Sequence, residues 1–138
     1  MRQSQTLIDV DTPGGGLFEI TGTVRAWTQA QSIATGLLTL FGRHTSASLL
    51  IQENAAPAAR RDLERYFARI APEAGDYEHD EEGPDDMPAH LRAALTATSL
   101  SVPVARGVPR LGTWQGIYLF EHRSRPHRRE IVLHLIGD

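Results

Sequence analysis

Apolar residues recur along the chain with two different spacings, and each spacing predicts one kind of element. Short runs that alternate apolar with polar residues, or that are apolar throughout, are typical of strands. They predict strands over residues 3–11, 17–20, 33–41, 45–51, 100–104, 114–122 and 131–136. We expect the runs 33–41 and 45–51, which follow one another closely, to form two neighbouring strands.

Apolar residues three and four positions apart predict the helices. Thr21 is placed to cap a helix in which Val24 and Trp27 share one face. The clearest amphipathic helix begins at Pro57, a residue that the first turn of a helix tolerates. Its apolar face comprises Leu63, Tyr66, Phe67 and Ile70. A shorter helix follows Pro88.

These elements predict an α+β fold with a β-sandwich-like core, because two to three helices accompany about seven strands without βαβ alternation. The length of 138 residues and the 41% hydrophobic content fit a single domain over residues 1–138. The strands at 114–122 and 131–136 are apolar on both faces, so each needs cover from both sides. In a chain this short, we expect a neighbouring subunit to supply that cover.

Composition removes several kinds of chemistry. All 14 basic residues are arginine, and there is no cysteine. Lysine-dependent phosphate loops, Schiff bases, thiol nucleophiles, cysteine-ligated metals and disulfides are therefore excluded. A net charge of −3 gives no general attraction to nucleic acid. No stretch approaches the ~20 apolar residues of a membrane span, and we expect a cytoplasmic protein with no membrane or nucleic-acid partner.

Charge is unevenly distributed. Eight acidic residues and no basic ones lie between Glu73 and Asp86, a run that we call the acidic segment, whereas arginines crowd the C-terminal third. Such a block is often only a solvated loop. The alternative is that the acidic and basic segments meet at one site or at one subunit contact.

The histidines are the main candidates for metal binding. His44 precedes a predicted strand, where a capped surface histidine is the simpler alternative, while His79 lies in the acidic segment and His90 near a helix start. No close metal-binding spacing such as H-E-x-x-H is present. If these three imidazoles converge beside carboxylates, they suit zinc, nickel or manganese better than magnesium.

Two further regions carry polar candidates. Glu53, followed by Asn54, is either a rim residue or a partly buried carboxylate with a raised pKa, and either form serves as a general base. The run Gly112–Gly116 places small residues around Trp114, which permits a ligand to approach the backbone, although a tight turn with a core tryptophan explains it equally. Serine catalysis at Ser46 or Ser48 is set aside because G-x-S-x-G is absent.

Six segments, in order along nearly the whole chain, carry a family resemblance. They are His44-Thr45-Ser46-Ala47-Ser48, Glu53-Asn54, Tyr77-Glu78-His79-Asp80, Gly83, Asp85-Asp86-Met87-Pro88-Ala89-His90 and Gly112-Thr113-Trp114-Gln115-Gly116. Together they resemble the YjbQ-like family, whose members are often called secondary thiamine-phosphate synthase enzymes. The resemblance implies a YjbQ-like fold assembled as a homotrimer, with its sites near subunit contacts.

The resemblance also implies a pocket, to whose residues we assign roles. We expect His44, Glu53 and Asn54 to be catalytic. We expect His44, His79 and His90 to hold a metal. The expected substrate-binding residues are Thr113, Trp114, Gln115, Glu121 and Arg129.

Two positions depart from the family pattern. Ala56 stands where many members have an aspartate, which removes a helix cap worth about 1 kcal/mol. The segment 123–128 is richer in arginine and has Pro126 where glycines are expected.

Three functions follow as expectations. The resemblance implies that the protein joins a pyrimidinylmethyl diphosphate to a thiazole phosphate, as a main or a secondary activity. In that reaction Arg129 and Arg123 would neutralise the diphosphate, and magnesium would suit the leaving group better than a histidine-bound metal. The alternatives are a metal-dependent hydrolase or lyase with a histidine-rich site, and a noncatalytic trimer that binds a small phosphorylated ligand.

Overall fold

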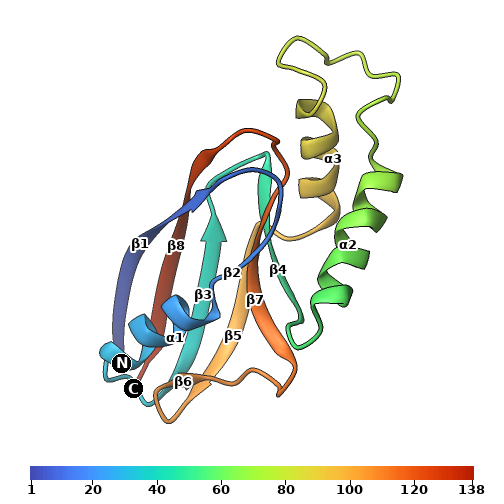
Figure 1. The fold of residues 1–138 in the computed structure, drawn as a ribbon. Helices are drawn as coiled ribbons and strands as arrows, with labels where there is room; N and C mark the ends of the chain where they lie inside the picture. Colours follow the sequence, from blue (N-terminus) through green and yellow to red (C-terminus); the bar gives the residue numbers. More distant parts are fainter.

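The computed structural model describes residues 1–138 as eight strands and three helices (Figure 1). The strands are β1 (Arg2–Thr12), β2 (Gly16–Glu19), β3 (Thr35–Gly42), β4 (Ala47–Glu53), β5 (Ser99–Ala105), β6 (Val108–Pro109), β7 (Gln115–Glu121) and β8 (His127–Gly137). The helices are α1 (Thr21–Ala30), α2 (Pro57–Ile70) and α3 (Asp86–Leu95). None of the helices has the length and apolar character that a membrane crossing requires.

The strands form two antiparallel sheets. One has the order β1-β8-β3-β5-β6 and the other the order β2-β7-β4. The main core contains buried side chains from both sheets, such as Leu40 of β3, Leu133 of β8 and Leu119 of β7. The expected α+β fold with a sandwich-like core is confirmed.

The two strands that are apolar on both faces are covered differently. On β7, Ile117 and Leu119 enter the main core, while Tyr118 and Phe120 face the other way. Helix α2 runs alongside the three-stranded sheet (Figure 1). Its Leu63 and Phe67 cover that second face of β7. The cover for β7 therefore comes from within the chain, and the expectation that it needs a neighbouring subunit is wrong. Strand β8 instead alternates between buried and half-buried residues, which leaves its outer face open to solvent.

Two local expectations are also wrong. Strands β3 and β4 are not neighbours, because the chain crosses at residues 43–46 from one sheet to the other and buries Leu40 and Leu49 from opposite sides of the core. Thr21 does not cap α1, whose N-cap position is Ile20. The hydroxyl of Thr21 instead accepts a hydrogen bond from the backbone N–H of Ile117 at 2.9 Å, which ties the helix to β7.

The departure at Ala56 is compensated by a neighbouring residue. Helix α2 begins at Pro57 as predicted, and Ala56 makes no side-chain cap. The carboxylate of Glu53 accepts hydrogen bonds from the backbone N–H groups of Ala55 and Ala56 at 3.1 and 3.0 Å. Glu53 therefore holds the turn that leads into α2.

Candidate metal centre

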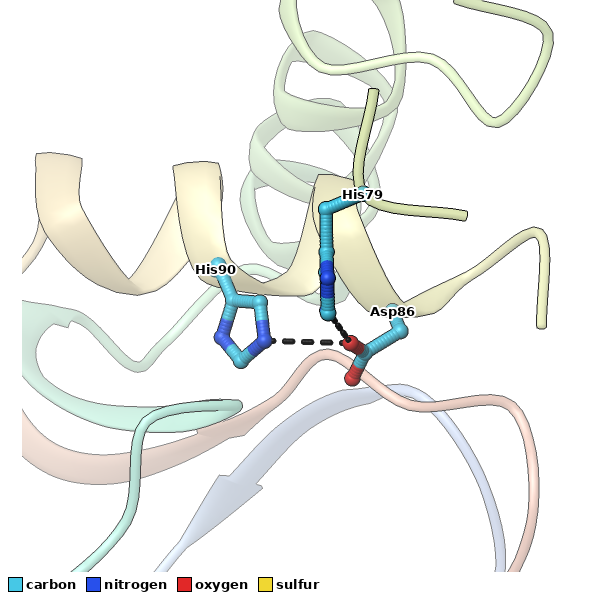
Figure 2. Close-up of side chains that lie close together, drawn as sticks. All are labelled: His79, Asp86 and His90. Carbon is cyan, nitrogen blue, oxygen red and sulfur yellow. Dashed lines mark hydrogen bonds and ion pairs between the residues drawn. The ribbon is translucent and has the colours of Figure 1, made fainter. Parts of the chain in front are cut away.

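Two histidines and one aspartate meet at the start of α3 (Figure 2). One ligand atom from each of His79, Asp86 and His90 lies within 4.8 Å of the other two. The Nε2 atoms of His79 and His90 lie 2.9 and 3.1 Å from Oδ2 of Asp86. We call these three residues the His-Asp cluster.

Helix geometry positions two members of the cluster. Asp86 is the first residue of α3 and His90 lies four residues later, so both side chains project from the same face. His79 approaches from the segment before the helix (Figure 2). The sequence predicts a helix that starts after Pro88, and such a helix would leave Asp86 out. The four-residue spacing of Asp86 and His90 is the signal that finds it.

A second hydrogen bond fixes the orientation of His90. Its Nδ1 lies 2.9 Å from the carbonyl oxygen of Thr45. A carbonyl oxygen only accepts hydrogen bonds, so Nδ1 carries a proton and Nε2 is the nitrogen directed at Asp86. Histidines that bind metals commonly donate their other N–H in this way, which fixes the tautomer and the ring.

Asp86 is held from its other side by an arginine. Its side chain is 3% exposed, and Nη1 of Arg123 donates to Oδ1 at 2.8 Å. Burial alone raises the pKa of Asp86, but the hydrogen bond with His79 and the charges of His90 and Arg123 outweigh it and lower the pKa. The carboxylate is therefore ionised, with Oδ2 left for the imidazoles.

The acidic segment and the C-terminal arginines meet at this point. Arg123 also donates from Nε to Oδ2 of Asp85 at 3.0 Å and from Nη2 to the carbonyl oxygen of Glu82 at 3.1 Å. Burial raises the pKa of Asp85, but the backbone N–H of Ser124 and the Arg123 guanidinium lower it to about 2. Asp85 thus balances the positive charge of Arg123, so the negative charge of Asp86 remains available to a cation at the cluster.

The cluster fits a transition-metal ion. The side chains of His79 and His90 are 49% and 30% exposed, so an ion can reach their nitrogens from solvent. Two imidazole nitrogens and one carboxylate oxygen suit zinc, iron, nickel or manganese better than magnesium, which prefers oxygen ligands. Three protein ligands also leave coordination positions for water and substrate.

His44 lies outside the cluster. Its Nε2 accepts the backbone N–H of Glu130 at 2.7 Å, so the proton of the neutral ring is on Nδ1. Burial and the positive charge of Arg129 lower the pKa of His44, which favours this neutral ring. His44 nevertheless lies beside the cluster, because His44, Thr45 and His90 line one surface depression of about 400 Å³.

Glu121 and Arg129 form a closed ion pair next to His44. Arg129 donates from Nε to Oε1 of Glu121 at 2.7 Å and from Nη2 to Oε2, and both residues are at least 95% buried, with exposures of 1% and 5%. The hydroxyl of Thr12 and the backbone N–H groups of His122 and Arg123 also donate to this carboxylate. Burial alone raises the pKa of Glu121, but the bonds from Arg129 and Thr12 lower it. Glu121 has no free oxygen for a ligand, and its role is to orient Arg129.

The remaining candidate residues lie at the opposite end of the three-stranded sheet. Strand β4 pairs Ala47 with Glu121 at one end and Glu53 with Gln115 at the other. Six residues of extended strand separate the two pairs by about 20 Å. The members of this far group are Glu53, Asn54, Thr113, Trp114 and Gln115. Within one chain they cannot contact a ligand held by the His-Asp cluster.

The far group is built around local contacts. Gln115 accepts the backbone N–H of Gly112 at 2.8 Å, and Asn54 donates to Glu19 at 3.2 Å. Trp114 is 63% exposed, so it is not the core tryptophan of a tight turn. This exposed aromatic side chain is available to a ligand or to a second chain.

A buried histidine that no sequence pattern indicates lies next to the ion pair. His122 is 3% exposed, and its Nε2 lies 2.9 Å from the hydroxyl of Ser48. Burial and the charge of Arg92 lower its pKa to about 3. His122 is therefore neutral at physiological pH, and its burial indicates a structural role.

Sequence comparison identifies the family of this chain. The sequence profile described as "UPF0047 protein YjbQ-like" matches residues 6–138. The chain belongs to the YjbQ-like (UPF0047) family. It is 49% identical over 138 residues to UPF0047 protein sll1880 of Synechocystis, covering 99% of this chain and 94% of that protein. It is 50% identical over 103 residues to UPF0047 protein YjbQ of Escherichia coli O157:H7, covering 75% of each.

Solved structures of YjbQ-like proteins share this fold. The conserved protein TT1486 of Thermus thermophilus superposes with a TM-score of 0.84 at 35% identity, covering 95% of this chain and 99% of that chain. The YbjQ-like protein SSO2532 of Sulfolobus solfataricus, described as of unknown function, gives a TM-score of 0.88 at 21% identity over 99% and 100% of the two chains. At 21% identity, the likeness to SSO2532 shows only that the two proteins share a fold.

Proposed function

We propose that this YjbQ-like protein is a metal-dependent hydrolase or lyase with its centre at the His-Asp cluster. The observation that carries the proposal is the arrangement of His90, whose Nδ1–H is held by Thr45 while its Nε2 points to the carboxylate that it shares with His79. A ring held in this way offers a fixed nitrogen to an ion. Both histidines are open to solvent, as a catalytic centre requires.

The residues of the centre have separable roles. His79, Asp86 and His90 would hold the ion, and Arg123 would keep Oδ2 of Asp86 directed at it. A bound divalent ion polarises a substrate oxygen and lowers the pKa of its water. The carboxylate of Glu82, 3.8 Å from Nε2 of His79, would serve as the general base. Glu53, expected as the base, is about 20 Å away along β4.

Thiamine-phosphate synthase-type transfer is the second candidate. It rests on the family resemblance and on a depression beside the cluster that is lined by two arginines and no carboxylate. It requires uncompensated positive charge for a diphosphate leaving group, but carboxylates already balance the charges of both expected arginines: Asp85 and Asp86 balance Arg123, and Glu121 balances Arg129. The geometry therefore favours the hydrolase or lyase.

We also propose that the chain assembles as a homotrimer. The outer face of the five-stranded sheet carries an apolar surface in which Leu7 and Phe41 both pair with Val132, and Leu37 pairs with Ile136. All of these except Val132 are more than a third exposed, at 37% to 46%. A subunit contact would bury this surface. Light scattering should give three times 15.2 kDa, and a monomeric mass would overturn the trimer.

Metal titration tests the centre. Protein treated with a chelator is titrated with zinc, manganese and nickel, and binding is followed by calorimetry. We expect one ion per chain, and at least a hundredfold weaker binding for His90→Ala. The matched control is His134→Ala, which changes a half-buried histidine on β8 whose Nδ1 contacts only Gln5. Equal affinity in wild type and His90→Ala would overturn the metal site.

Turnover is measured with the same proteins. We expect the metal-loaded wild type to hydrolyse p-nitrophenyl phosphate or p-nitrophenyl acetate, and His90→Ala to lose this activity. Thiamine phosphate formation from the two purified halves is measured in parallel. Formation that depends on His90, without ester hydrolysis, would favour the transferase instead. Metal binding without turnover of either kind would contradict an enzymatic function and would favour a noncatalytic binding protein.

A further inference from the structure

A second depression adjoins the one that holds His44 and His90, and its lining contains two arginines and no carboxylate. It has a volume of about 490 Å³ and is lined by Phe41, Gly42, Arg43, His44, Thr45, Ser46, Thr98 and Arg129. The chain has 17 acidic and 14 basic residues, so a lining with two arginines and no acid is a local reversal of its overall charge. Such a lining favours an anion.

Arg129 supplies a donor that is already oriented. The residue is 95% buried, with an exposure of 5%, and Nε and Nη2 are both bonded to Glu121. Nη2 also donates to the hydroxyl oxygen of Ser46 at 3.0 Å. Nη1 makes no hydrogen bond within the chain and belongs to a residue that lines the depression. A guanidinium held on two sides loses little entropy when it binds an anion with its third nitrogen.

The residues between β3 and β4 add further donors. Since Nε2 of His44 accepts the N–H of Glu130, the Nδ1–H of this neutral ring has no partner in the chain. The hydroxyl of Ser46 receives a bond from Arg129 and keeps its own hydrogen to donate. The backbone N–H groups of His44, Thr45 and Ser46 donate no hydrogen bond within the chain.

Arg43 adds charge at the mouth of the depression. Its Nη1 lies 3.6 Å from the carboxylate of Glu130, and the two side chains are 54% and 39% exposed. An ion pair this long and this exposed contributes little, so Arg43 can turn to an incoming anion at small cost.

The two depressions share His44, Thr45 and Thr98, so they adjoin one another between Arg129 and His90, and we call the two together the groove. We propose that the end of this groove at Arg129, His44 and Ser46 is a subsite for the phosphate group of a small phosphorylated substrate. The substrate would then extend along the groove to the His-Asp cluster. This inference deepens the proposed function and rests on it for the direction of the substrate, but not for phosphate binding itself.

Calorimetry with inorganic phosphate tests the subsite in chelator-treated protein. We expect binding to wild type, about tenfold weaker binding to Arg43→Gln, and several-fold weaker binding to Ser46→Ala, because each loses one donor to a charged oxygen. The control is Arg128→Gln, an exposed arginine of β8 that pairs with Asp9 and is outside the depression. It removes the same charge and should bind phosphate as wild type does.

Three results would overturn the subsite. They are an absence of phosphate binding to wild type, an equal loss in Arg128→Gln and Arg43→Gln, and acetate binding as tight as phosphate binding. The variant His90→Ala separates this inference from the proposed function. It should bind phosphate normally while failing to bind metal, so each proposal can fail while the other stands.

Discussion

Two carboxylates near one end of the molecule, Glu121 and Asp86, are alike in burial and charge but differ in what surrounds them. They are 1% and 2% exposed, each accepts a hydrogen bond from an arginine, and each has a lowered pKa. Arg129, the partner of Glu121, is itself buried, and every oxygen of that pair is satisfied within the chain. Asp86 instead directs one oxygen at two imidazoles that are open to solvent.

The comparison teaches that burial and the direction of a pKa shift do not distinguish a structural carboxylate from a functional one. In both cases hydrogen bonds and nearby positive charges outweigh the effect of burial on the pKa. The exposure of the remaining partners makes the distinction, because an ion can bind a nitrogen of an exposed imidazole, whereas both oxygens of Glu121 are already bonded within the chain. We call the Glu121–Arg129 pair the closed site and the His-Asp cluster the open site.

Breaking the closed site should have the largest effect on stability. Glu121→Gln leaves the guanidinium of Arg129 buried without its counter-charge, and loss of one partner from a buried pair costs about 3–5 kcal/mol. Urea denaturation measures this change in the free energy of unfolding. The control Asp9→Asn breaks the exposed pair with Arg128 and should cost less than about 1 kcal/mol. A similar loss in both variants would contradict the distinction between the sites.

Acid should destabilise the protein through the buried histidine beside the closed site. The pKa of His122 is about 3 in the folded chain and near 6.5 when unfolded. Between these values only the unfolded state takes up the proton, so the free energy of unfolding falls by up to about 1.4 kcal/mol for each unit that the pH decreases below about 6.5. Above about pH 6.5 His122 makes no such contribution.

Denaturation of wild type and His122→Gln at several pH values checks this slope. Glutamine keeps a donor and an acceptor near Ser48 but takes up no proton. Its stability should fall less steeply than that of wild type between pH 6 and 4. Parallel curves for the two proteins would show that His122 is not the group responsible.

Asp85 should make an intermediate contribution to the free energy of unfolding. It holds Arg123, which in turn bonds to Asp86 of the open site. Its folded pKa of about 2 is below the unfolded value near 3.9, so its contribution is complete above about pH 4 and is lost as the pH falls toward 2. Asp85→Asn should cost about 2 kcal/mol at pH 7. The cost should shrink toward zero near pH 2, and a cost independent of pH would exclude the charge as its origin.

Changes confined to the open site should affect stability least. The side chain of His79 is 49% exposed, so His79→Ala should change the free energy of unfolding by less than about 1 kcal/mol. The same variant should bind zinc at least tenfold more weakly, since it loses one of three ligands. Thermal denaturation and calorimetry give the two numbers. A large loss of stability with unchanged zinc binding would reverse the assignment of open and closed sites.

Much of the fold was predictable because periodicity is a local property. The strands and helices were found within a few residues, since alternation and three- and four-residue spacings reflect burial on one face. The missed element, β6, has only two residues and no pattern of its own. The expectation that β3 and β4 are neighbours was wrong because sheet order depends on contacts between distant segments, which periodicity does not contain.

The site was predictable in part. His79 and His90 do converge. The four-residue spacing between Asp86 and His90 would have indicated Asp86 as a third member, but only if the helix is taken to begin at Asp86. The place of His44 was not detectable, because its Nε2 is taken by the backbone of Glu130, 86 residues away. The separation of Glu53 from the histidines follows from the β4–β7 register.

The amino-acid sequence alone determined which elements form, which chemistries are absent for want of lysine and cysteine, and which family the chain resembles. These follow from residue identity and short-range spacing. The tertiary structure alone decided which carboxylate joins the histidines, which arginines are already neutralised and which side chains stay open to solvent. Those properties depend on long-range hydrogen bonds and on solvent access, and both arise only when distant segments pack together.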